Sequence, residues 1–241
     1  MKKLLFLSAF LFLLTTVFGQ SPWWIGGRLG VNFTTVSGQY NGDSDTKHKW
    51  ITTPVFGATA IYSVSNLIGI SAELNLAKSG ALYEYSYTGE SRSSEKFTFR
   101  ERYTTIQIPI LARFTFGETW QFFAYGGFYW SYILGGKYVA KSDNYDDQSG
   151  KIKFGDEPDN YEGDDRYLDK DYNRRMDIGL NIGGGVQRQL GPGVLFLDFR
   201  FGLGFLDSNK FPEDRDKPDG YKSFNNRSLS LSAGYIFNLG K

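Results

Sequence analysis

The 241-residue chain has no cysteine and only one histidine, His48. Without cysteine it has neither a disulfide framework nor the lipid anchor of a lipoprotein, so backbone pairing and side-chain burial must stabilise it. The formal net charge of +1 gives the chain no strong positive electrostatic field that would attract nucleic acid, so no nucleic-acid partner is expected. Beyond its first twenty residues the chain also has no apolar run approaching 18 residues, which excludes a membrane-spanning helix there.

The first twenty residues, MKKLLFLSAFLFLLTTVFGQ, contain the apolar run that the rest lacks. Two lysines form a short positive region, and residues 4–14 are almost all apolar. Val17-Phe18-Gly19 then places small or medium-sized residues at the positions that signal peptidase recognises. This pattern predicts a secretory signal peptide at residues 1–19 and one exported domain at residues 20–241. A single membrane anchor is the alternative, although the run is shorter than the ~20 residues of a spanning helix.

The chain is rich in glycine, with 29 residues, and in aromatic side chains, at 17%. In the segment RYTTIQIPILARFTF, apolar and polar residues alternate with the period of two that is typical of a β-strand. Every second side chain from Ile106 to Phe116 lies on an apolar face, and the residues between them, such as Gln107, lie on the opposite face. We interpret Pro109 as an inward-pointing bulge or bend, and Pro54 as a second one.

Seven further segments alternate in the same way, so the sequence predicts eight strands. In each strand the apolar residues share one face and the polar residues share the other. The predicted strands cover residues 24–36, 52–64, 68–82, 102–116, 121–137, 175–189, 194–205 and 228–239.

The connections between these strands are alternately long and short. Three are tight, at residues 65–67, 117–120 and 190–193, where Asn, Gly and Pro favour turns. Four are long and polar, at residues 37–50, 83–96, 138–174 and 206–224. Short periplasmic turns opposite long extracellular loops are typical of an outer-membrane barrel with both chain ends in the periplasm.

An apolar sheet face with no helices to cover it is suited to lipid, where the sheet must close to pair its backbone. We therefore predict an all-β fold, an eight-stranded antiparallel up-and-down transmembrane β-barrel in a Gram-negative outer membrane. Outer-membrane lipid and lipopolysaccharide are its expected surroundings. A ring of eight strands leaves an interior that side chains can fill. The alternative is a soluble ligand-carrying barrel, which would keep its apolar face inside.

Six charged residues fall on the polar, inward face, and their charges balance. They are Arg28, Arg113 and Arg200 against Glu73, Asp177 and Asp198. Because buried charges must be paired, we expect them to form a network of salt bridges that fills the interior. An ion or proton path is the alternative interpretation.

The third long loop is acidic, with eleven acidic residues against four basic ones in residues 143–171. Clustered carboxylates can hold calcium, although no window has the spacing of a regular calcium loop. A solvated loop, a contact with divalent-bridged lipopolysaccharide, and a ligand-binding surface are the other interpretations. The candidate calcium ligands are Asp156, Glu157, Asp159, Glu162, Asp164 and Asp165.

His48 is the only histidine that could serve as the base of a hydrolase at the barrel rim. It lies between two lysines and close in sequence to Ser44. A lone loop histidine is usually solvated, so we assign no catalytic residue and no cofactor.

Four segments of the predicted strands stand out: YTTIQIPILARF (103–114), YGGFYWSYILGGK (125–137), DIGLNIGGGVQRQLGPGVLFLDFRFGLGFLD (177–207) and NRSLSLSAGYIF (226–237). They resemble strands of the PorT-like outer-membrane barrels of Bacteroidetes, and the resemblance covers nearly the whole mature chain. The resemblance implies a non-enzymatic accessory or structural barrel that acts through other outer-membrane or periplasmic proteins, with a link to type IX secretion. A surface module that binds through its extracellular loops is the alternative, and a rim hydrolase is a further one.

Overall fold

The computed structural model describes residues 22–39, 46–88, 94–155, 163–211 and 217–240. The predicted signal peptide at residues 1–19 lies outside these residues. No helix in the described ranges is long and apolar enough to span a membrane.

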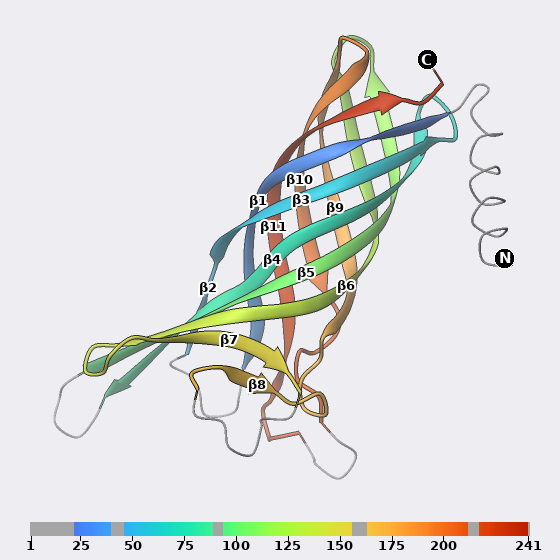
Figure 1. Ribbon diagram of the computed structural model, residues 1–241. Helices are drawn as coiled ribbons and strands as arrows, with labels where there is room; N and C mark the ends of the chain where they lie inside the picture. The colour runs from blue at the N-terminus through green and yellow to red at the C-terminus, as the bar shows by residue number, and fades with distance from the viewer. Residues whose placement is uncertain (1–21, 40–45, 89–93, 156–162, 212–216, 241) are drawn as a thin grey trace, which may run out of the picture.

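Within the described ranges, eleven strands form a single sheet, and eight of them close into a ring (Figure 1). Around the ring the order is β1-β3-β4-β5-β6-β9-β10-β11, and β11 pairs with β1 to close it. Every pairing in the ring is antiparallel, which confirms the predicted eight-stranded up-and-down barrel. The strands are β1 Trp23–Gln39, β2 Lys47–Lys49, β3 Ile51–Ser63, β4 Ile68–Thr88, β5 Ser94–Gly117, β6 Gln121–Ser142, β7 Gln148–Phe154, β8 Arg166–Leu168, β9 Met176–Leu190, β10 Gly193–Gly204 and β11 Lys222–Asn238.

Side chains alternate between the inside and the outside of the ring as the sequence predicts. Leu111 is 1% exposed, whereas its neighbour Ile110 on the outer face is 60% exposed. Along β5 the outward apolar positions run from Ile106 to Phe116, which at about 3.3 Å per residue and a tilt of about 40° spans roughly 25 Å. That height matches the apolar band of membrane barrels, and the outward apolar face rules out the soluble alternative.

The two ends of the barrel differ, and we call them the turn end and the loop end. At the turn end, Gly117 and Gly191 take positive φ angles of 102° and 61°, which most side chains would resist. The Ser65 hydroxyl there accepts a hydrogen bond from the Ile68 N–H at 3.0 Å. The start of β1 and the end of β11 also lie at the turn end (Figure 1). The predicted tight turns, and the shared side of both chain ends, are confirmed.

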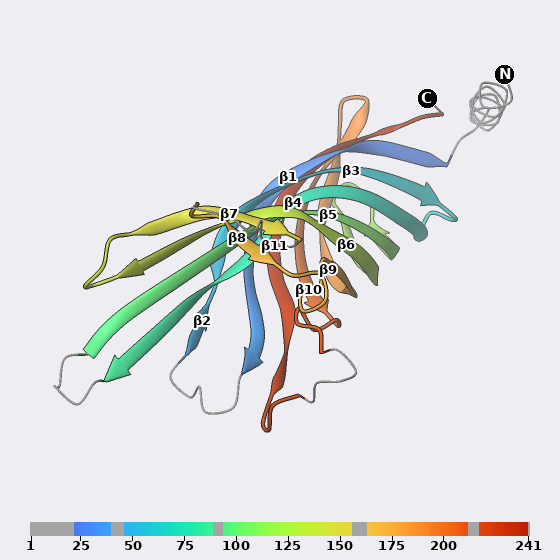
Figure 2. The same ribbon diagram turned by 60° about the horizontal axis from the view of Figure 1, so that its bottom comes forward.

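At the loop end, three ring strands continue well beyond the barrel and form the extension, which comprises residues 79–88, 94–104 and 135–142 together with β2, β7 and β8 (Figure 2). Two predicted loops are therefore wrong. Most of residues 83–96 belongs to the β4–β5 hairpin, and residues 138–174 contain the end of β6 together with β7 and β8. The acidic third loop is thus partly folded sheet and not simply a solvated loop.

Aromatic pairs across the strands stabilise the extension. On its inner face the Phe99 ring lies 6.3 Å from Tyr83 on β4 and 5.6 Å from Tyr138 on β6, and Tyr85 lies 5.8 Å from Phe97. Such pairs add to strand pairing, so the hairpin continues where composition alone suggests a polar loop.

The irregular positions of the wall are not all where the sequence places them. Pro109 points inward as predicted, but β5 pairs with β6 around it without a shift. On its other side the pairing with β4 is interrupted and resumes in the same register, as expected for a residue without an N–H. The bulge lies instead between Thr104 and Thr105, where the extension leaves the barrel. Pro54 faces outward and is exposed, so its predicted role is wrong.

Candidate functional site

The interior of the barrel is layered, and the layer nearest the turn end is apolar. Inward side chains from five strands pack together there and close the lumen. The Arg113 guanidinium lies 3.7 Å above the Phe123 ring and donates a hydrogen bond to the Gln187 side-chain oxygen at 2.5 Å. The buried apolar residues of this layer are Ile61, Leu111, Phe123, Tyr125, Val194, Phe196 and Ile236.

Four charged residues form a compact ion-pair cluster in the middle of the barrel, which we call the plug. Arg28 on β1 pairs with Glu73 on β4 and with Asp198 on β10, both at 2.9 Å. Arg200 on β10 donates two hydrogen bonds to the two oxygens of Glu73, each at 2.8 Å. No residue of the plug is more than 8% exposed. Each arginine therefore contacts two carboxylates, as charges removed from water require.

Polar neighbours hold the plug in place. The Tyr125 hydroxyl donates to Asp198 and accepts a hydrogen bond from Arg200 Nε at 3.0 Å. Tyr125 can lean across β9 because Gly183 has no side chain, and a Cβ there would come within 2.7 Å of the tyrosine oxygen. Asn75 donates to Glu73 at 2.9 Å. The lumen is thus filled by matched groups from both halves of the chain.

Two of the six predicted interior charges lie outside the plug. Arg113 belongs to the apolar layer nearer the turn end. Asp177 lies nearer the loop end, where its carboxylate accepts hydrogen bonds from the Tyr129 hydroxyl at 3.1 Å and from Asn226 at 3.0 Å. Both side chains are buried and face inward, but neither has an ion pair among the described residues.

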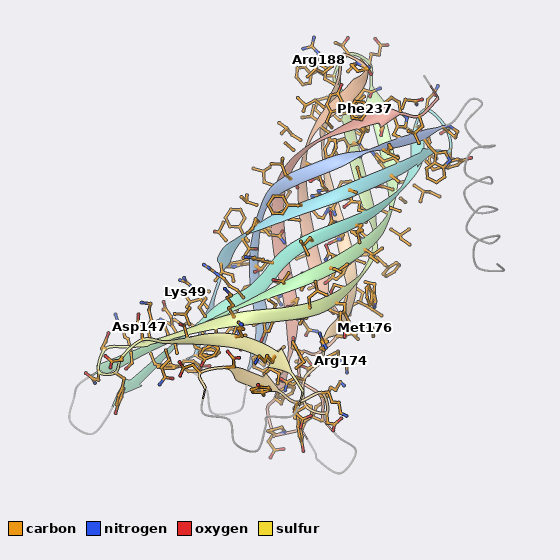
Figure 3. All side chains as sticks on the ribbon, in the orientation of Figure 1. Lys49, Asp147, Arg174, Met176, Arg188 and Phe237 are labelled. Atoms are coloured by element: carbon orange, nitrogen blue, oxygen red, sulfur yellow. The ribbon has the colours of Figure 1, made fainter. Side chains whose placement is uncertain are left out.

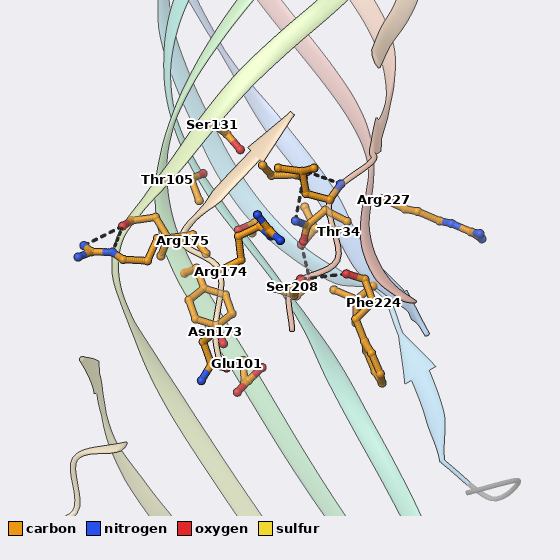
Figure 4. Close-up of a pocket in the computed structure, with 18 of the residues that line it drawn as sticks. Thr34, Glu101, Thr105, Ser131, Asn173, Arg174, Arg175, Ser208, Phe224 and Arg227 are labelled. Atoms are coloured by element: carbon orange, nitrogen blue, oxygen red, sulfur yellow. Dashed lines mark hydrogen bonds between the residues drawn. The ribbon is translucent and has the colours of Figure 1, made fainter. Parts of the chain in front are cut away.

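Beyond the plug, toward the loop end, the lumen opens into a cavity of about 480 Å³, which we call the vestibule. Its wall on the side of the plug includes small polar side chains, among them Thr34, Thr105 and Ser131 (Figure 4). Its wall farther from the plug is the aromatic inner face of the extension. A cavity of this size lies within the range of small-molecule sites, which usually combine apolar walls with a few polar groups.

The roof of the vestibule is built from the third and fourth loops, which bond to each other. The Asp207 carboxylate accepts hydrogen bonds from the Tyr221 hydroxyl at 2.9 Å and from the Phe224 N–H at 3.0 Å. Arg174 reaches across from the third loop and donates from Nε to the Asp207 carbonyl at 3.1 Å. The roof is therefore held in one arrangement before any ligand arrives, which lowers the entropic cost of binding.

An ion pair joins the extension to its terminal strand at the rim. Arg166 on β8 lies 3.0 Å from Glu101 on β5, and both residues line the vestibule. Burial raises the pKa of the Glu101 carboxyl above its ordinary value, against the opposing attraction of Arg166. No sequence pattern indicates this pair, because its residues lie far apart in the chain and in segments that resemble loops.

The calcium prediction is supported by none of the described geometry. Asp156, Glu157, Asp159 and Glu162 lie outside the described residues. The Asp164 carbonyl accepts a hydrogen bond from Tyr138, and Asp165 pairs with Lys153 at 2.7 Å. Across the described ranges there is no group of three or more metal-ligating side chains.

His48 lies in the vestibule wall, not on an open rim. Its Nδ1 is 3.0 Å from the Val36 carbonyl oxygen, and its ring packs 5.1 Å from Tyr83 and 5.8 Å from Phe224. These are contacts of a packed wall residue, and Ser44 lies outside the described residues. The geometry therefore adds nothing to the hydrolase hypothesis.

Comparison with protein families assigns most of the chain to a known domain. The family model described as "Outer membrane protein beta-barrel domain" matches residues 18–210. The chain belongs to this family. As an outer-membrane β-barrel, it lies in the outer membrane with its short turns toward the periplasm and its extension outside the cell.

Several solved outer-membrane barrels are similar to this outer-membrane β-barrel. Ail, the attachment invasion locus protein of Yersinia pestis, is 14% identical with a TM-score of 0.37, covering 89% of this chain and 98% of Ail. The neisserial surface protein NspA is 13% identical with a TM-score of 0.40, covering 90% and 97%. OprG from Pseudomonas aeruginosa is 12% identical with a TM-score of 0.43, covering 91% and 98%. Among curated proteins, no sequence matches this chain.

Proposed function

We propose that this outer-membrane barrel is a non-enzymatic surface binding module that holds a small ligand in its vestibule. The observation that carries the proposal is the contrast along the lumen. The plug fills the middle of the barrel with paired charges, while the lumen beyond it stays open with a volume of about 480 Å³. A filled ring of eight strands is poorly suited to conduction, and a preformed cavity is well suited to binding.

The wall chemistry suggests the class of ligand. Tyr83, Phe99 and Tyr103 line the vestibule together with hydroxyl and amide groups and with charged groups such as Glu101 and Arg174. Aromatic faces bind flat apolar surfaces, and hydroxyls and amides bind polar groups. We therefore propose a polar ligand with one apolar face, such as an oligosaccharide or a short peptide segment.

A cavity-filling variant tests the binding proposal. Ser131→Trp places a large ring in the vestibule, while Tyr132→Trp on the neighbouring outward position serves as the control. Oligosaccharides and short peptides would be titrated against each detergent-solubilised protein by calorimetry. We expect a member of one panel to bind the wild type and the control but not Ser131→Trp. Binding that survives in a folded Ser131→Trp protein would show that the vestibule is not the site.

A second candidate is the partner-dependent accessory role implied by the resemblance to the PorT-like barrels. Two strands of the extension, β2 and β8, stand at the ends of the described strand order. Edge strands of this kind can accept a strand from another protein. The test is to place an affinity tag after Gln20, solubilise outer membranes in mild detergent, and identify stoichiometric partners. Secretion components among them would support this role, and a barrel recovered alone would favour the binding module.

A further inference from the structure

The outer face of the extension and of the adjoining part of β4 carries positive charges that have no acidic partner among the described residues. They come from four neighbouring strands, and all five side chains are exposed. Among the described residues none of them forms an ion pair. We call this group the cationic patch, and it consists of Arg100 and Arg102 on β5, Lys137 on β6 and Lys151 on β7, together with Lys78 on β4, which directly precedes the extension.

The register places three of these charges in a row. Arg102 lies directly opposite Lys137, and Lys137 lies directly opposite Lys151, so all three share one face of the sheet. Neighbouring strands are about 4.8 Å apart, and like charges directly opposite each other are destabilising. The arrangement therefore favours an anion that lies over the patch.

Three carboxylates of this region pair with lysines outside the patch. Glu84 pairs with Lys49 at 2.7 Å, Asp147 pairs with Lys141, and Asp165 pairs with Lys153 at 2.7 Å. The Asp165 carboxylate also accepts a hydrogen bond from the Lys151 backbone N–H at 2.9 Å. Its ion pair, however, is with Lys153 and not with the Lys151 ammonium group. In this part of the sheet, the described acids do not neutralise the patch.

The position of the patch relative to the apolar band identifies the anion. On β4 the outward residue before Lys78 is Leu76, 48% exposed, and on β6 the exposed Leu134 precedes Lys137. On β5 the outward series ends at Ile106, and Arg102 follows after Thr104. On three adjacent strands the outer face thus changes from apolar to cationic at the level where a bilayer's hydrocarbon ends. Figure 3 shows the outward side chains of the barrel and of the extension from one side.

We propose that the cationic patch is a binding site for the phosphate groups of a phosphorylated glycolipid in the outer leaflet, the chemistry of lipopolysaccharide. The acyl chains lie against Leu76 and Ile106, and the phosphates lie over Arg102, Lys137 and Lys151. This site is separate from the vestibule, and the two proposals can fail independently.

The test is the triple variant Arg102→Gln/Lys137→Gln/Lys151→Gln. Its control is Arg188→Gln/Lys217→Gln/Lys222→Gln, which removes the same charge from exposed positions outside the patch. Each protein is refolded in neutral detergent, and its affinity for purified lipopolysaccharide and for the dephosphorylated form is measured. Because each basic group near an anionic lipid surface strengthens binding, we expect the patch variant to bind the phosphorylated lipid at least about tenfold more weakly. The control should bind like the wild type.

Stability without lipid separates binding from a structural role. In neutral detergent alone the patch variant should be as stable as the wild type or more stable, because like charges no longer face each other. If the triple variant does not fold, Lys137→Gln alone is tested in the same way.

Four results would overturn the proposal. The first is affinity of the folded patch variant within twofold of the wild type. The second is an equal loss of affinity in the control. The third is equal binding of the dephosphorylated lipid to the wild type. Inorganic phosphate that binds as tightly as the glycolipid would also exclude a lipid site, because the acyl contacts would then contribute nothing.

Discussion

The plug and the vestibule occupy the same lumen on the same eight strands, yet one is filled and the other is open. Around the plug and toward the turn end, the inward positions carry arginine, tyrosine and phenylalanine, such as Arg28, Tyr125 and Phe196. Just beyond the plug they include small side chains such as Thr34 and Ser131. The same ring of strands forms the wall in both places, so the size of the inward residues determines where the barrel is closed and where it can bind.

The largest expected effect breaks the plug. Glu73→Ala removes the acceptor that Arg28 and Arg200 share and leaves two arginines incompletely paired in a buried site, which should cost about 3–5 kcal/mol of unfolding free energy. The matched control is Glu84→Ala on the extension, where the Lys49 pair is exposed to solvent and should contribute about 0–1 kcal/mol. Urea unfolding in lipid vesicles measures both, and equal losses would contradict the difference between the regions.

A second variant breaks the extension and spares the plug. Gly80 has a φ of 132°, and a Cβ there would approach the Glu101 carbonyl oxygen to 2.1 Å. Gly80→Val should therefore lower the stability of the extension by about 1–3 kcal/mol without affecting the plug. We expect limited proteolysis to cut the extension while the barrel keeps its folded mobility on unheated gels. Gly27→Val is the control, because a Cβ at Gly27 meets only an ordinary contact at 3.7 Å.

The pH dependence of stability distinguishes the extension from the plug, because Glu101 lines the vestibule and is not part of the plug. Burial raises its pKa above the ordinary value of 4.5, so between 4.5 and the raised pKa the folded state holds more protons than the unfolded state. The stability of the extension should therefore fall as pH rises through that window and level off above it. Hydrogen exchange of the β5 amides, corrected for intrinsic rates, measures this, and Glu101→Gln should flatten the curve. An unchanged slope in Glu101→Gln would assign the effect to another group.

The smallest effect concerns the wall beside the plug. Pro109→Ala supplies an N–H where the pairing of β4 with β5 is interrupted, but it also frees the unfolded chain. These effects oppose each other, and the unfolding free energy should change by less than about 1 kcal/mol. The vesicle assay used for Glu73→Ala measures it, and a comparable loss would mean that the proline itself supports the plug.

Strict alternation made the barrel predictable from sequence. A period of two assigns every strand residue to one face, so the alternation alone is enough to place Arg28, Glu73, Asp198 and Arg200 inside the ring. Which of them meet could not be predicted, because pairing depends on the register around the ring. Arg28 and Asp198 are 170 positions apart in the sequence and yet bond at 2.9 Å. For the same reason Arg113 and Asp177 fall at other heights in the lumen.

The extension and the vestibule were missed for a different reason. In residues 83–85, 96–100 and 138–154 the inner face is aromatic and the outer face is charged, but glycines and polar residues interrupt the pattern in the sequence. Strand pairing there depends on Phe99 meeting Tyr83 and Tyr138, and these contacts exist only once three strands are aligned. The roof bonds around Asp207 likewise join residues that local sequence does not relate.

The composition of the plug also imposes an order on assembly. Arg28 comes from the first strand of the ring, its partner Asp198 from the seventh, and Ser232, which also accepts a hydrogen bond from Arg28, from the last. These groups meet only when the two edges of the sheet join, so an unclosed sheet in the bilayer carries incompletely neutralised charge. Closure removes the open edges and neutralises the arginine in one event. Arg28 on the first strand is therefore fully paired only after the last strand has joined it, and the plug stabilises the barrel only at the end of insertion.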